Sequence, residues 1–81
     1  MTISPAQCRA ARGLLGWSQD ELTVATGGGV AKRSLIRFEQ GATSPQPRTI
    51  DAIRSALEAA GVEFIPENGG GPGVRLRGRE T

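Results

Sequence analysis

The chain has 81 residues, of which 37% are hydrophobic and 4% aromatic, and this length allows one small domain but excludes a second hydrophobic core. The formal net charge is +2, and all basic residues except Lys32 are arginines, which suit bidentate pairing with guanine edges and phosphates. A single cysteine, Cys8, and the lack of histidine exclude an internal disulfide and a Cys/His zinc site.

Membrane and secretion signals are missing from the sequence. No apolar run approaches the roughly 20 residues that cross a bilayer, and no charged segment followed by an apolar segment marks a secretion signal. We therefore expect a soluble cytoplasmic protein with no membrane partner and no cofactor. In that reducing compartment Cys8 is expected to be a small buried hydrophobic residue.

The first two helices are predicted from two capping boxes. Ser4-Pro5-Ala6-Gln7 combines an N-cap serine, a proline at the first helical position and a glutamine two residues later, which predicts a helix running toward Leu14. Ser18-Gln19-Asp20-Glu21 repeats the pattern, with Trp17 and Leu22 placed as a hydrophobic staple. This second helix should end near Thr26, before three consecutive glycines.

The third helix is predicted to have two different faces. Val30, Leu35 and Phe38 form an apolar stripe, and Gly41 follows as a stop. The opposite side carries cationic side chains, those of Lys32, Arg33 and Arg37. Two short helices joined by a glycine turn, the second exposing cationic hydrogen-bond donors, form an arrangement that fits the DNA major groove.

The rest of the chain changes from helical to strand periodicity. Pro47 suits the start of a fourth helix that Gly61 closes. Residues 62–65 and 74–77 then alternate apolar and polar side chains, as strands do. Gly69–Gly73 between them could suggest a nucleotide-binding loop, but no helix with a P-loop lysine follows. A hairpin connector is the better interpretation.

Taken together, residues 3–61 resemble the four- or five-helix DNA-binding domain of the lambda-repressor-like, Xre-type regulators. The predicted fold is mainly α, with a helix-turn-helix domain at 1–61 and a β extension with a frayed end at 62–81. The best register leaves two extra residues between Leu22 and the turn glycine. The resemblance rests on Arg12, the run Trp17-Ser18-Gln19-Asp20-Glu21-Leu22, Leu35, the run Arg37-Phe38-Glu39, and Gly41.

The resemblance implies three sets of residues. An ion pair of Arg12 with Glu39 would join the first helix to the end of the third. The DNA contacts divide into base-reading and phosphate-binding groups. Base edges would be read by Lys32, Arg33, Ser34 and Arg37, and phosphates would be held by Gln19, Ser18, Thr43, Ser44 and Arg48.

The resemblance also implies a function. We expect a bacterial or phage transcription regulator that binds an inverted-repeat operator as a homodimer, as a repressor or as an activator, without a small-molecule effector. An antitoxin that binds a partner toxin and regulates its own operon is the alternative. No enzyme chemistry is expected, because no set of side chains converges on a reaction.

The β extension is expected to mediate assembly. Val62, Phe64, Val74 and Leu76 fall on one face of the predicted hairpin, and an isolated hairpin is marginal in water. These residues would pack on the helices while the strand edges pair across a two-fold axis. Alternatively, the extension folds back within one monomer and the fourth helix forms the dimer.

Overall fold

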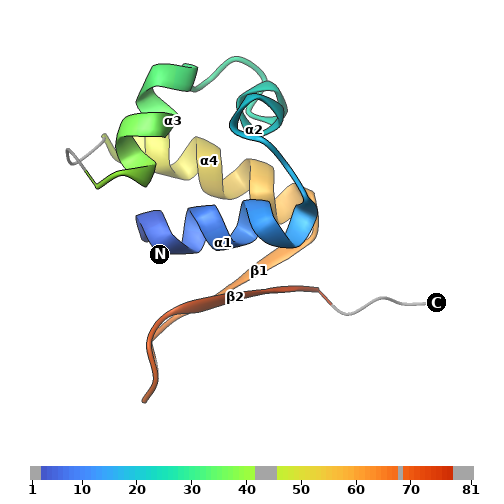
Figure 1. Cartoon of the computed structure of the whole chain (residues 1–81), viewed down its shortest axis with the longest axis vertical. Helices are drawn as coiled ribbons and strands as arrows, with labels where there is room; N and C mark the ends of the chain where they lie inside the picture. The colour runs from blue at the N-terminus through green and yellow to red at the C-terminus, as the bar shows by residue number, and fades with distance from the viewer. Residues whose placement is uncertain (1–2, 42–45, 68, 78–81) are drawn as a thin grey trace.

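The computed structural model describes residues 3–41, 46–67 and 69–77, and it has four helices followed by an antiparallel hairpin (Figure 1). The mainly α fold with a β extension is therefore confirmed. None of the described helices is long and apolar enough to cross a membrane. The elements are α1 (Pro5–Leu15), α2 (Gln19–Ala25), α3 (Lys32–Glu39), α4 (Pro47–Ala59), β1 (Val62–Ile65) and β2 (Gly73–Leu76).

Both capping boxes form. The Ser4 hydroxyl accepts from the Gln7 main-chain N–H while the Gln7 side chain accepts from the Ser4 N–H, and Ser18 and Glu21 repeat this exchange at α2. Four main-chain donors that a helix start would leave unpaired are thereby satisfied. In contrast, α3 begins after Ala31 without a side-chain cap.

The connection from α2 to α3 needs glycine. Gly27 and Gly28 have φ angles of 70° and 87°, a left-handed conformation that side chains with a Cβ disfavour. The reversal lets Leu22 on α2 and Leu35 on α3 both become fully buried. The turn between α2 and α3, although two residues longer than the family pattern, therefore preserves the packing of the two helices.

A single core joins the helices to the hairpin. Val62 is fully buried and Phe64 is 7% exposed, and both belong to the cluster that contains Leu35, Ile53 and Leu57. Their side chains are covered by this chain's own residues, so they cannot form a surface for a partner. Val62 and Phe64, two of the four residues predicted for dimerisation, are thus core residues of this chain that pack on its helices.

The hairpin pairs Val62 with Leu76 and Phe64 with Val74. β2 begins at Gly73, one residue earlier than predicted, because Gly73 pairs with Ile65 at the end of the ladder. α1 packs against both the hairpin and α3 and lies between them, as Figure 1 shows. The sheet and α3 thus lie on opposite sides of α1.

Candidate nucleic-acid interface

The outward face of α3 carries the four predicted base-reading residues. Leu35 and Phe38 are buried against the core, which fixes the opposite face of the helix toward solvent. The side chains on that face, Lys32, Arg33, Ser34 and Arg37, all belong to exposed residues. Such a surface offers hydrogen-bond donors of the kind that recognise the major groove.

One of these residues already has a partner. The Lys32 Nζ lies 3.0 Å from Oδ1 of Asp20 on α2, and both side chains are exposed. The pair connects the starts of the two helices, although an exposed ion pair contributes little to stability. DNA would have to compete with Asp20 for the Lys32 ammonium, so Arg33 and Arg37 are the better candidates for reading bases.

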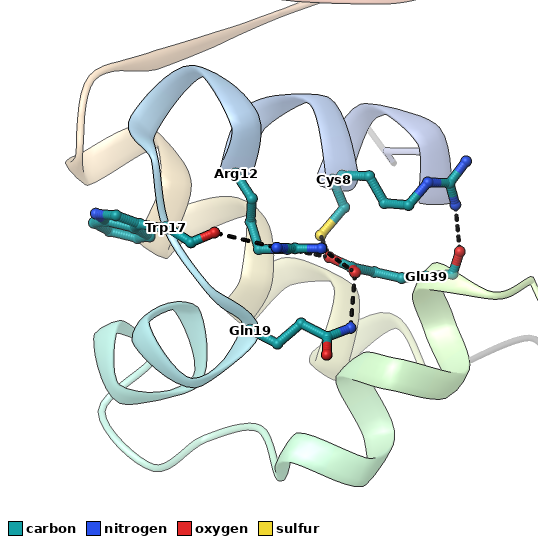
Figure 2. A network of polar contacts seen from close by, with 6 residues as sticks. Cys8, Arg12, Trp17, Gln19 and Glu39 are labelled. Atoms are coloured by element: carbon teal, nitrogen blue, oxygen red, sulfur yellow. Dashed lines mark hydrogen bonds and ion pairs between the residues drawn. The ribbon is translucent and has the colours of Figure 1, made fainter.

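The carboxylate of α3 faces the protein interior. Glu39 is 4% exposed. Arg12 donates two hydrogen bonds of 2.8 Å to its carboxylate, from Nε to Oε2 and from Nη2 to Oε1 (Figure 2). The third nitrogen of the guanidinium donates to the main-chain oxygen of Trp17 at 3.1 Å. This bidentate pair fixes the C-terminal end of α3 to α1 and keeps its negative charge away from phosphates.

Three further donors converge on Glu39. The Cys8 thiol donates to Oε2 at 3.1 Å and the Gln19 amide nitrogen donates to Oε1 at 3.0 Å, while Arg9 donates to the main-chain oxygen of Glu39. Cys8 and Arg9 were not predicted from the sequence to belong to this site. A signal was present, because Cys8 and Arg12 are four residues apart and share one face of α1.

Burial and hydrogen bonding act on the Glu39 carboxyl in opposite directions. Burial disfavours the charged form, but the hydrogen bonds from Arg12, Cys8 and Gln19 together hold the pKa of Glu39 below the ordinary value of a glutamate. Burial and the adjacent carboxylate raise the pKa of the Cys8 thiol. Glu39 is therefore ionised and Cys8 protonated at neutral pH, the states that their hydrogen bond requires.

The depressed pKa of Glu39 predicts that the ion pair of Arg12 with Glu39, called the clamp below, is sensitive to acid. Its stabilisation is complete above the unfolded-state pKa of about 4.3 and is lost as the pH falls through the lower pKa of the folded state. We expect Glu39→Gln to destabilise the protein at neutral pH and to reduce the loss of stability on acidification. Urea unfolding at about pH 7 and about pH 3 measures this difference. An unchanged pH dependence in the variant would contradict it.

The predicted phosphate-binding residues are placed around α3 in different ways. Gln19 uses one amide hydrogen on Glu39, which leaves the second hydrogen of that group as a possible donor to a phosphate. Ser18 is exposed and accepts the Glu21 N–H as a cap, so only its own hydroxyl hydrogen is left to donate. Arg48 is exposed in the first turn of α4. Thr43 and Ser44 lie outside the described residues.

Comparison with known proteins agrees with this geometry. The sequence profile of the family described as Helix-turn-helix matches residues 9–63, which include α1 to α4 almost entirely and the start of β1. None of the curated proteins compared with the chain matches it significantly. The matched region covers more than half of the chain and holds the α2–turn–α3 unit and the Arg12–Glu39 clamp. The chain therefore belongs to the helix-turn-helix family of the Xre, lambda-repressor-like type, and it is a DNA-binding transcription regulator.

Proposed function

We propose that this protein binds an inverted-repeat operator as a homodimer and represses transcription by occupying promoter DNA. The observation that carries the proposal is the division of charge on α3. Its cationic side chains face solvent, whereas its acidic residue, Glu39, is buried against Arg12. A helix arranged in this way presents donors to DNA without presenting a carboxylate to the phosphates.

Base reading is assigned first to Arg33 and Arg37. A guanidinium can donate two parallel hydrogen bonds to O6 and N7 of guanine, a pattern that only this base offers in the major groove. Lys32 and Ser34 lie beside them on the exposed face of α3. They would contribute single hydrogen bonds rather than bidentate ones.

Phosphate contacts would set the position of α3 in the groove. The Gln19 amide is held by Glu39, so its orientation depends on the same carboxylate that fixes the end of α3. Through this link, one clamp would align a phosphate contact with the reading helix. Arg48 would add a second, purely electrostatic contact from the start of α4.

Selection of bound duplexes from random DNA tests the function. We expect enrichment of an inverted repeat with half-site centres about 10 bp apart, or a multiple of that spacing. Guanines are expected among the enriched bases, because Arg33 and Arg37 favour them. Enrichment of a single asymmetric site, or of no sequence, would contradict the homodimeric assignment. A reporter with the selected site placed over its promoter distinguishes repression from activation.

A further inference from the structure

The hydrogen-bond pattern of the hairpin determines which groups β2 presents at its outer edge. The Arg77 N–H donates to the Gly61 carbonyl at 2.7 Å, so these two residues form a hydrogen-bonded pair of the antiparallel ladder. Such pairs alternate with non-hydrogen-bonded ones. With the observed register, the main-chain groups of Val74 and Leu76 therefore point away from β1.

This outer edge is open in the monomer. Within residues 3–41, 46–67 and 69–77, no hydrogen bond from another element reaches the main-chain N–H or C=O of Val74 or Leu76. Leu76 is 46% exposed, and among the residues that the structure describes only Leu14 and Val24 are likewise large hydrophobic residues at the surface. A free strand edge with an exposed leucine is a template for pairing with another strand.

From this pattern we infer that β2 pairs antiparallel with β2 of a second copy, and that the two hairpins form one continuous four-stranded sheet. The inference rests on the homodimer proposed above and specifies its interface. Val74 lies opposite Leu76 of the partner subunit, and Arg75 lies at the two-fold axis. In this register the outward N–H and C=O groups of both Val74 and Leu76 are paired. In any other symmetric register of Gly73–Leu76, at least one of these two residues is left without a hydrogen-bonding partner in the opposite strand.

The side chains of β2 allow this strand to pair with the same strand of a second copy. Two Arg75 side chains would meet at the axis, and like charges at opposing positions are unfavourable. Each is already neutralised, because Arg75 Nε and Nη2 lie 3.1 and 3.2 Å from the two carboxylate oxygens of Glu63. At the ends of the register, Arg77 faces Gly73 of the partner subunit, which has no side chain to obstruct it.

The resulting symmetry suits DNA binding. The two-fold axis of an antiparallel strand pair is perpendicular to the sheet. Because α1 packs on the sheet and α3 lies beyond α1 (Figure 1), this axis places both copies of α3 on the same side of the dimer. One duplex can then meet both recognition helices.

The interface is small. Pairing of two four-residue strands buries less than the roughly 1,200 Å² of a typical stable complex. The dimer should therefore dissociate on dilution and become stronger on an inverted repeat, where binding of one copy raises the effective concentration of the other.

Disulfide trapping tests the register directly. In a non-hydrogen-bonded pair the Cα atoms are about 4.5 Å apart, within the range that a disulfide can bridge. Arg75→Cys should therefore form a covalent dimer on mild oxidation without DNA. Arg77→Cys is the matched control: it lies beside Arg75 on the same sheet face, but it faces Gly73 of the partner subunit, so four residues of about 3.4 Å each separate it from its counterpart along the strands. Cys8 is fully buried and does not interfere. Equal trapping of both variants, or none, would overturn the register.

Sedimentation measurements provide a second, independent test. Leu76→Lys should shift the monomer–dimer equilibrium toward monomer, because a lysine on an edge strand opposes pairing. Val24→Lys, which replaces another exposed apolar residue (77% exposed) on α2, should leave that equilibrium unchanged. Circular dichroism confirms that both variants remain folded. Unaltered dimerisation of folded Leu76→Lys would overturn the proposal.

A duplex with a single half-site separates the interface from the function. Leu76→Lys should bind this duplex as the unmodified protein does, and should lose only the added affinity for the inverted repeat. If the unmodified protein binds DNA specifically, but Arg75→Cys is not trapped and Leu76→Lys does not shift the equilibrium, the interface is wrong and the regulator assignment stands. If trapping succeeds but no duplex is bound specifically, the interface stands and the proposed function is wrong.

Discussion

Removal of Arg12 or Glu39 should destabilise the protein strongly and non-additively. Each alanine substitution leaves its partner's charge unpaired in a largely desolvated site, which costs about 3–5 kcal/mol in buried ion pairs. The Cys8 and Gln19 donors also lose their acceptor in Glu39→Ala. The double variant should lose much less than the sum of the single losses, because neither charge remains. Urea unfolding of the four proteins in the cycle measures the coupling energy.

The exposed pair of Arg75 and Glu63 is a control of similar geometry. It is also bidentate, but its side chains are 64% and 45% exposed, compared with 20% and 3% for Arg12 and Glu39. Solvent screening should make its coupling much smaller. Comparable couplings in the two cycles, or additive losses for Arg12 and Glu39, would mean that burial does not determine the strength of the clamp.

Arg33→Ala should reduce affinity for the selected operator by about 1–3 kcal/mol and relax the preference at one base pair. The variant loses a bidentate contact to a guanine edge. This contact does not exist in a non-specific duplex, so the affinity for such a duplex should change little. Arg48→Ala should instead weaken binding to all sequences similarly and lower the salt slope by about one unit. Titrations of the operator and of single-base variants at several salt concentrations separate the two effects.

Arg77→Ala provides the charge-matched control for these titrations. Arg77 follows β2, on the side of α1 opposite to α3, and its Nη2 donates to the Glu58 carbonyl. Its loss should hardly change binding to a single half-site, although it removes the same charge. A uniform loss on all duplexes for Arg33→Ala would remove this residue from the base-reading set.

The accuracy of the sequence predictions followed the range of the interactions involved. The starts of α1 and α2 were predictable because Ser4 with Gln7, and Ser18 with Glu21, are neighbours along the chain and cap their own helices. The exposed cations of α3 were predictable because Leu35 and Phe38 fix the orientation of the helix. The place of Cys8 beside Arg12 on one face of α1 could be read from the sequence. Its convergence with Gln19 on Glu39 could not, since that depends on how three helices meet.

The extension shows the same limit. Alternation of side chains predicted both strands, but it could not tell whether the apolar face would meet this chain or another. Val62 is fully buried in the monomer core, whereas Leu76, its cross-strand partner, remains 46% exposed. Burial thus divides the four residues proposed for dimerisation, and only the β2 side remains available for a second chain.

Gln7 links the first helix of the domain to its hairpin. Its side-chain oxygen completes the capping box at the start of α1, and its amide nitrogen donates to the Gly73 carbonyl at 3.0 Å, 66 residues further along. Gln7 is 5% exposed, so the second bond satisfies a donor that has lost its water. During synthesis α1 emerges early, but the acceptors of this amide nitrogen, the carbonyl oxygens of Ile65 (3.5 Å) and Gly73, become available only with the hairpin. The side chain that caps α1 is therefore fully paired only when β2 is in place.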